Sequence, residues 1–288
     1  MPPSDHPFLR RPTLTMWLLT ILRILFLAYV GLGLFALLCA NGLIFPVPAP
    51  TYRDTPGQTK LPSPDGHHIT AVYLPNPSAP YTLLYSHGNA EDLGTIEQTL
   101  HELRARGWAV FAYDYPGYGT STGKPSESGC YAAIAAAYSY LTTLKNVPPE
   151  RIVLYGRSLG SGPSLELATH VPVGGIILDG AFTSTFRVFI PCKLLFWDKF
   201  DNLAKITHLH PPLPPILSIH GTVDKTVPFW HGVALDAAYP GPKEHLWIQG
   251  ADHNNILEVA PAAYWDAIER FRLSLPASSP ATTSPQTS

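Results

Sequence analysis

The sequence is poor in cysteine and in charge, and each shortage excludes a class of protein. Its three cysteines, Cys39, Cys130 and Cys192, are too far apart for a disulfide framework or a zinc site. We expect Cys130 and Cys192 to be buried free thiols, with pairing in an oxidising compartment as the alternative. Charged residues make up 14% of the chain and the formal net charge is −2, with Lys and Arg scattered. Nothing therefore predicts nucleic-acid binding, and no metal or other cofactor is expected.

One long apolar run lies near the N-terminus. Residues 24–45 carry no charge, and their number matches the ~20 residues that a helix needs to cross a ~30 Å hydrocarbon core. With residues 16–22 as an extension, they predict a transmembrane helix over 16–45 that follows an N-terminal tail over 1–15.

The flanks of this run indicate its orientation. Arg10, Arg11 and Arg23 precede it, and no basic cluster follows it. By the positive-inside rule, we expect a single-pass membrane protein with a cytoplasmic N-terminus and an extracytoplasmic catalytic domain. A cleaved signal peptide is the alternative, although the run is long for one and the sequence before Ala40 is a poor cleavage site.

The rest of the chain divides at proline-rich stretches. Residues 46–64 predict an extended linker that could include a first edge strand, and residues 276–288 predict a disordered tail. Between them, over 65–275, strand-like and helical segments alternate, which predicts a mostly parallel sheet covered by helices on both faces. The strand-like segments are 69–74, 81–86, 109–113, 152–155, 175–178, 216–219 and 244–248, and the main helical segments are 93–106, 128–144, 161–170 and 261–275.

A G-x-S-x-G motif provides a candidate nucleophile. Gly156 and Gly160 surround Ser158, directly after the apolar strand-like residues 151–155 and before a helical segment. This strand–turn–helix context is typical of a nucleophile elbow, in which side chains at the glycine positions would collide with the strand or the helix. Ser158 is therefore the predicted nucleophile, and the backbone N–H of Leu159 is a predicted oxyanion donor.

A serine nucleophile needs a base and a carboxylate that orients the base, and these are expected at the same sheet edge. His253 follows the last strand and is the predicted base. Asp224, after the preceding strand, completes the chain order Ser-Asp-His, with Asp179 as a rival acid. Asp252 is discounted because adjacent side chains rarely point at each other. The second oxyanion donor is predicted to be the backbone N–H of Asn89.

Several longer stretches resemble the depalmitoylating branch of the abhydrolase-domain serine hydrolases and its prokaryotic relatives, within the α/β-hydrolase superfamily. They are YSHGNAEDLG, YDYPGYGTSTGKPSE, LYGRSLGSGPS, ILDGAFTS, DKFDNLAKI, HGTVDKTVP and GADHNNI. The resemblance extends over residues 81–265 and implies an α/β-hydrolase fold with Ser158, Asp224 and His253 as triad. It implies esters or thioesters as substrates without naming one. Depalmitoylases of this branch carry a cysteine-rich, acylated N-terminus, whereas this chain has an apolar helix and an expected extracytoplasmic domain, which disfavours protein depalmitoylation.

The insertion between Asp179 and the strand at 216–219 indicates what kind of substrate the site could accept. Only about 35 residues follow Asp179 there, so we expect a short cap and an open site. Phe186, Phe189 and Trp197 in this insertion are either core residues or the lining of an acyl-chain groove. We therefore expect a lipid-like acyl ester as substrate, reached at the bilayer.

Two other functions stay open at this point. A peptidase of the serine-aminopeptidase type is one, although a short cap offers little to hold a peptide terminus. A catalytically inactive membrane-tethered binding module is the other, and it predicts a missing triad or oxyanion element. Epoxide hydrolase and dehalogenase chemistry need a carboxylate at the elbow, so Ser158 excludes both.

Overall fold

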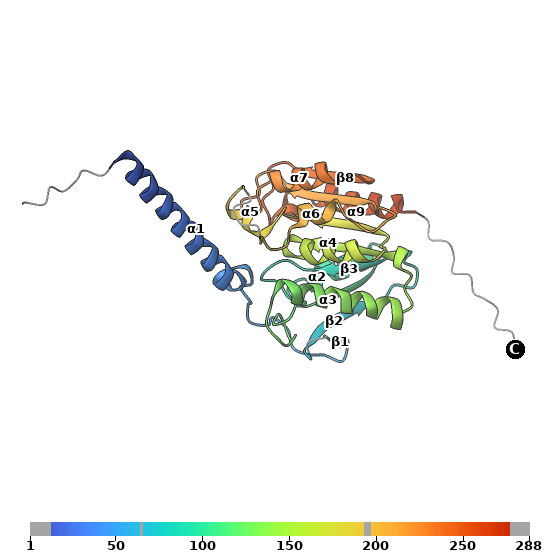
Figure 1. Cartoon of the computed structure of the whole chain (residues 1–288). Helices are drawn as coiled ribbons and strands as arrows, with labels where there is room; N and C mark the ends of the chain where they lie inside the picture. The colour runs from blue at the N-terminus through green and yellow to red at the C-terminus, as the bar shows by residue number, and fades with distance from the viewer. Residues whose placement is uncertain (1–12, 64–65, 193–196, 277–288) are drawn as a thin grey trace, which may run out of the picture. The chain divides into compact units, whose positions relative to one another are not determined.

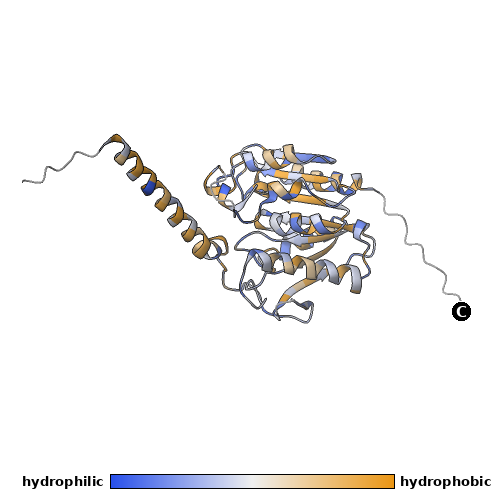
Figure 2. Cartoon of the chain, viewed as in Figure 1, coloured by the Kyte–Doolittle hydropathy of each residue, from blue (hydrophilic) through white to orange (hydrophobic). Residues whose placement is uncertain are grey.

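The structure is a computed structural model that describes residues 13–63, 66–192 and 197–276 (Figure 1). The chain divides into two compact units, residues 1–43 and 44–288. The first contains all but the last residue of helix α1 (Leu14–Ile44), which includes an 18-residue window of mean hydropathy 2.4 and is long and apolar enough to cross a membrane (Figure 2). At about 1.5 Å per residue its 31 residues span about 46 Å. The predicted apolar helix is confirmed, whereas most of the tails over 1–15 and 276–288 lies outside the described residues.

The second unit is built on a single eight-stranded sheet among the described residues. Its order is β1-β2-β4-β3-β5-β6-β7-β8, with β2 antiparallel to both of its neighbours and the other pairs parallel. The strands are β1 (Gln58–Pro62), β2 (His68–Leu74), β3 (Thr82–Ser86), β4 (Ala109–Tyr113), β5 (Ile152–Arg157), β6 (Gly175–Asp179), β7 (Ile216–Gly221) and β8 (Lys243–Ile248). This is the α/β-hydrolase fold that the sequence predicts.

Helices cover both faces of this sheet. On one face, α2 (Glu97–Ala105) and α9 (Pro261–Ser274) enclose a core to which β3 contributes Leu83 and Tyr85. On the other face, α3 (Glu127–Ser139) packs beside α4 (Ser161–His170), with α6 (Asn202–Ile206) next in the row (Figure 1). Strands β3 to β7 are buried along almost their whole length, which explains why they appear in the sequence as short continuous apolar runs.

The remaining helices are short or follow the sheet edge. They are α5 (Thr185–Phe189), α7 (Trp230–Ala238), α8 (Ile256–Val259), a π-helix over Tyr140–Leu144 and two single 3-10 turns over Pro149–Arg151 and Ser158–Gly160. Helix α5 lies in the insertion after β6, which is short as expected. The sequence analysis did not predict α7.

Two sequence predictions need correction. The helix expected from residue 93 begins only at Glu97, because Asp92 and Thr95 form a side-chain-bonded turn before it. Cys192 is exposed rather than buried, because the segment after α5 lies at the surface. Cys130 is buried as expected, and all three cysteines are free thiols in the described part of the chain.

Candidate active site

The turn between β5 and α4 holds Ser158 in a strained conformation. Its φ is +48°, a value that non-glycine residues seldom adopt. A Cβ at Gly160 would lie 2.0 Å from the carbonyl oxygen of Ser86, and one at Gly156 would lie 2.8 Å from the oxygen of Gly160. Both glycines are thus required by close backbone contacts with β3 and with the start of α4. The Ser158 side chain is presented at the carboxyl edge of the sheet as a result.

The predicted base and acid lie within hydrogen-bond distance of this serine. His253, after β8, has its Nε2 3.0 Å from Ser158 Oγ and its Nδ1 2.6 Å from Asp224 Oδ2. Asp224 follows β7, so residues 66 and 29 positions apart meet at one edge. All three are at most 9% exposed. This geometry lets His253 accept the hydroxyl proton while Asp224 orients its ring.

Asp224 is held as a charged carboxylate. Its Oδ1 accepts the backbone N–H of Thr226 and of Val227 at 2.9 and 2.7 Å, and its Oδ2 lies 3.3 Å from His220 Nε2. Burial by itself raises the pKa of Asp224, but the hydrogen bonds from His220 and His253 outweigh burial and hold that pKa well below its usual value. A permanently charged partner stabilises the imidazolium that forms when His253 takes a proton.

The other two candidate acids have different partners. Asp179, at the end of β6, accepts hydrogen bonds from Tyr155 at 2.8 Å and Tyr264 at 3.2 Å, on the side of α9. Asp252 accepts the backbone N–H of Lys225 at 2.9 Å and that of His253 at 2.7 Å. Among the three carboxylates weighed from the sequence, the structure therefore brings only Asp224 to the ring of His253.

The predicted oxyanion donors lie on neighbouring loops. Strands β3 and β5 pair in parallel with Ser86 opposite Gly156, so the loop that contains Asn89 runs beside the elbow that contains Leu159. The N–H of Gly88 is engaged by Glu91 at 2.6 Å. The next N–H along this loop belongs to Asn89. Its side chain is held by the hydroxyl of Tyr118 at 2.7 Å.

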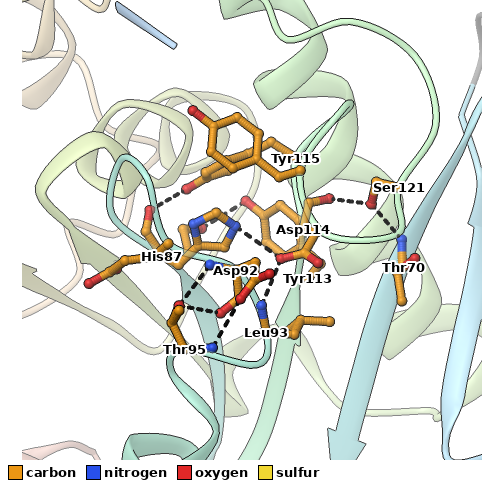
Figure 3. Close-up of polar contacts among 12 residues, drawn as sticks. Thr70, His87, Asp92, Leu93, Thr95, Tyr113, Asp114, Tyr115 and Ser121 are labelled. Atoms are coloured by element: carbon orange, nitrogen blue, oxygen red, sulfur yellow. Dashed lines mark hydrogen bonds and ion pairs between the residues drawn. The ribbon is translucent and has the colours of Figure 1, made fainter. Parts of the chain in front are cut away.

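A second histidine–aspartate pair supports this loop, and sequence reasoning missed it. His87 and Asp114 follow β3 and β4, and both side chains are fully buried (Figure 3). His87 Nδ1 donates to the carbonyl oxygen of Gly88 at 2.8 Å, and Nε2 lies 3.3 Å from Asp114 Oδ1. Burial lowers the pKa of His87, but the contact with the Asp114 carboxylate outweighs burial and raises that pKa above its ordinary value. An imidazolium therefore fits both contacts.

The variable residue of the elbow motif, Arg157, connects three loops. Its guanidinium forms an ion pair with Glu91 in the Asn89 loop and donates to Asn254 Oδ1, beside His253, at 3.1 Å. These side chains line a small cavity of about 130 Å³ next to His253. The sequence analysis overlooked Arg157 because the motif G-x-S-x-G accepts any residue between Gly156 and Ser158. The sequence hint of a partner is Glu91, an acidic residue shortly after His87 and Gly88.

The three predicted acyl-groove residues differ in their exposure. Phe189 is 77% exposed at the end of α5, whereas Phe186 and Trp197 are partly buried. Their neighbours Leu194, Leu195 and Phe196 lie outside the described residues. Exposure of Phe189 is incompatible with a place in the core, but an acyl-chain groove stays a prediction. In residues 13–63, 66–192 and 197–276, no group of three or more His, Cys, Asp or Glu is arranged to hold a metal ion.

Comparisons with known proteins bear on the family of this chain and on its fold. A family model described as serine aminopeptidase, S33, matches residues 78–213, a range that includes the elbow but ends before Asp224. Alpha/beta hydrolase domain-containing protein 17B of Xenopus tropicalis is 42% identical over 195 residues, which cover 66% of this chain and 67% of that protein. The Homo sapiens protein 17B is 41% identical with the same coverage. The chain belongs to the alpha/beta hydrolase domain-containing protein 17 family.

Membership of this family confirms the resemblance to this branch of the abhydrolase-domain serine hydrolases. Solved structures agree on the fold. An esterase of Pyrococcus furiosus superposes with a TM-score of 0.64 at 16% identity, over 80% of this chain and 96% of that one. The esterase domain of a Rhodothermus marinus protein superposes with a TM-score of 0.57 at 19% identity, over 75% and 97%. At such low identity these structures bear on the fold alone.

Proposed function

We propose that this member of the family is a membrane-anchored serine hydrolase that cleaves the ester or thioester bond of lipid-like acyl substrates. One observation carries the proposal: Asp224, His253 and Ser158 are connected by hydrogen bonds of 2.6 and 3.0 Å at the edge of the sheet. A serine contacted by an oriented histidine is the arrangement that nucleophilic acyl transfer needs.

The reaction has two steps. Ser158 Oγ attacks the acyl carbonyl carbon while its proton passes to His253 Nε2, and the carbonyl oxygen becomes an oxyanion that the N–H groups of Leu159 and Asn89 stabilise. The intermediate collapses, the C–O or C–S bond breaks, and the leaving group takes the proton from His253. Water, deprotonated by His253, then attacks the acyl-enzyme and releases the carboxylic acid and free Ser158.

A lipid-like acyl group as substrate is supported by apolar side chains of the insertion after β6 and by helix α1. Phe189 is an exposed aromatic side chain on the insertion after β6, and Phe186 and Trp197 lie in the same insertion. A helix of 31 residues that includes an 18-residue window of mean hydropathy 2.4 is suited to anchor the hydrolase domain at a bilayer, where acyl chains are concentrated. We therefore assign these three side chains to contact with the acyl chain.

The same proposal includes the layout of the chain. A tail over 1–15 and a transmembrane helix over 16–45 precede the catalytic domain predicted over 65–275, and a tail over 276–288 follows it. Residues 46–64, predicted as a linker, include β1 (Gln58–Pro62), which is a strand of the domain's sheet. Arginines on the N-terminal side of the helix support a cytoplasmic N-terminus and an extracytoplasmic catalytic domain.

Labelling of intact membranes with a fluorophosphonate probe tests the chemistry. The wild-type chain is expected to react, and Ser158→Ala is expected to lose both the label and turnover by at least about 10⁴-fold, because it lacks the nucleophile. Ser164→Ala, which changes another buried serine of helix α4, is the matched control and should keep both. Absence of labelling in the wild type would favour the inactive binding module.

A substrate series then separates the remaining alternatives. Long-chain p-nitrophenyl esters and acyl thioesters are expected to be turned over better than acetate esters. Preferential cleavage of aminoacyl p-nitroanilides would instead support the peptidase alternative, which the description of the matched family model also names. A membrane-impermeant probe added to sealed cells should label Ser158, and protection from that probe would overturn the proposed topology.

A further inference from the structure

The chain that follows helix α1 contacts the loop of the predicted oxyanion donor. We call residues 44–52 the exit segment. At its start, Asn89 Nδ2 donates to the carbonyl oxygen of Ile44 at 2.5 Å. The next side chain, Phe45, is only 4% exposed and packs edge-on against Phe200 with 6.2 Å between ring centroids. The exit segment is therefore part of the packed hydrolase unit rather than a free tether.

At its other end, the exit segment contacts the same loop again, at Asp92. Thr51 donates its backbone N–H to Asp92 at 2.7 Å and its hydroxyl to the other carboxylate oxygen. Burial raises the pKa of Asp92, but the hydrogen bonds from Thr51 and Thr95 outweigh burial and lower that pKa, so the carboxylate is charged. The loop from residue 87 to 95 is thus held at two points, Asn89 and Asp92, by residues that precede the sheet.

Tyr52 connects the exit segment to the buried histidine. Its hydroxyl donates to Asp114 Oδ2, while Asp114 Oδ1 lies 3.3 Å from His87 Nε2 and accepts the N–H of Leu93 at 2.9 Å (Figure 3). His87 in turn donates through Nδ1 to the carbonyl oxygen of Gly88 at 2.8 Å. A chain of polar contacts therefore runs from the half-buried Tyr52 through the buried Asp114 and His87 to one backbone carbonyl, with an ion-pair contact between Asp114 and His87.

That carbonyl belongs to the peptide group that also contains the predicted oxyanion donor. The C=O of Gly88 and the N–H of Asn89 lie in one plane and point in opposite directions, because the peptide bond is planar and trans. A hydrogen bond that holds the oxygen of Gly88 in place consequently sets the direction of the N–H of Asn89.

Two glycines make room for Tyr52 and Thr51 beside this path. A Cβ at Gly119 would lie 1.9 Å from Asp114 Oδ2 and 2.6 Å from the hydroxyl of Tyr52, and one at Gly94 would lie 2.4 Å from Thr51 Oγ1. Thr120 also donates its backbone N–H to the hydroxyl of Tyr52 at 3.2 Å. Close packing on two glycines fixes the exit segment to the domain.

We propose that the exit segment is part of the catalytic apparatus, and that Tyr52 is a positioning residue that acts through Asp114 and His87 on the N–H of Asn89. This inference rests on the proposed function, since an oxyanion donor matters only if Ser158 carries out acyl transfer. The segment that leaves the membrane helix thereby takes part in setting the rate of the reaction as well as in anchoring.

The test compares Tyr52→Phe with Tyr138→Phe in the full chain, purified in detergent. Each variant loses one tyrosine hydroxyl. Tyr138 lies on α3, and its hydroxyl donates to the carbonyl oxygen of Pro172 at 2.9 Å rather than to the loop that contains Asn89. We expect Tyr52→Phe to lower kcat for a p-nitrophenyl ester about tenfold with KM unchanged, because the donor meets the oxyanion less well. We expect Tyr138→Phe to keep kcat, although both variants melt a few degrees lower.

A trifluoromethyl ketone with an alkyl chain gives a second readout. Ser158 Oγ adds to its carbonyl carbon, the proton passes to His253, and the adduct carries an oxyanion. We expect Tyr52→Phe, and to a lesser extent Thr51→Val, to weaken inhibition, with Tyr138→Phe unchanged. Equal kcat and equal inhibition in all the variants would overturn the inference alone. Lack of any Ser158-dependent turnover in the wild type would instead overturn the proposed function, and the inference with it.

Discussion

Two histidine–aspartate pairs join neighbouring strand ends in this domain, and they differ in what the second ring nitrogen contacts. His253, oriented by Asp224, has its other nitrogen 3.0 Å from the hydroxyl of Ser158. His87, paired with Asp114, has its other nitrogen 2.8 Å from the carbonyl oxygen of Gly88. A hydroxyl can give up a proton, whereas a carbonyl oxygen can only accept a hydrogen bond.

The comparison teaches that the same two residue types serve opposite purposes. His253 is placed to receive a proton, so its Nε2 faces a group that can supply one. His87 is fully buried between two acceptors and fits them best when it carries both protons, as a fixed cation. The first pair is thus suited to chemistry, and the second to holding the loop on which that chemistry depends.

The largest expected effect distinguishes Asp224 from the other strand-end acid. Asp224→Asn should lower kcat about 10³- to 10⁴-fold, because the amide no longer orients and stabilises the protonated ring of His253. Asp179→Asn is the matched control and should keep most activity, since Asp179 contacts Tyr155 and Tyr264 instead. Steady-state hydrolysis of a p-nitrophenyl ester measures both, and an equal loss in the two variants would contradict the assignment of Asp224.

Substitutions in the pair of His87 and Asp114 should reduce mainly the stability of the fold, whereas substitution of Asp224 reduces mainly activity. Asp114→Asn leaves the buried cation of His87 without its counter-charge, so we expect a loss of about 3–5 kcal/mol in the free energy of unfolding. Urea unfolding measures this quantity. The double variant His87→Gln/Asp114→Asn removes the unpaired charge as well and should recover part of the loss. Strictly additive losses would show that the two side chains are not coupled.

The smallest effect concerns pH. Because the pKa of His87 is raised in the folded protein, its contribution to stability is complete below the unfolded value of about 6.5 and is lost as pH rises through the raised pKa. The free energy of unfolding of the wild type should therefore approach that of His87→Gln as pH increases above about 6.5. A difference between them that grows in this range would argue against a buried imidazolium.

Much of the site could be predicted from the sequence, because its landmarks are local. Gly156 and Gly160 around Ser158 identify a turn whose backbone contacts allow no side chain. The other triad members follow strands of a parallel sheet, and the carboxyl ends of such strands share one edge. Strand positions themselves were visible as short apolar runs, since β3 to β7 are buried on both faces.

The supporting contacts could not be predicted in the same way. Nothing in the residues around Tyr52 indicates Asp114, which lies 62 positions later, or Arg157 as the partner of Glu91. Such pairs depend on which loops the sheet order places side by side, and that order is not written in any single motif.

By itself, the sequence determined the alternation of strands and helices, the apolar helix at the N-terminus and the identity of the predicted nucleophile, because burial periodicity and glycine placement are local properties of a chain. Only the tertiary structure decided which acid meets His253 and which histidine is buried between Asp114 and the carbonyl oxygen of Gly88. It alone also revealed that the exit segment packs against the catalytic loops. Those outcomes depend on three-dimensional contacts between residues tens of positions apart, and the strand order sets these contacts.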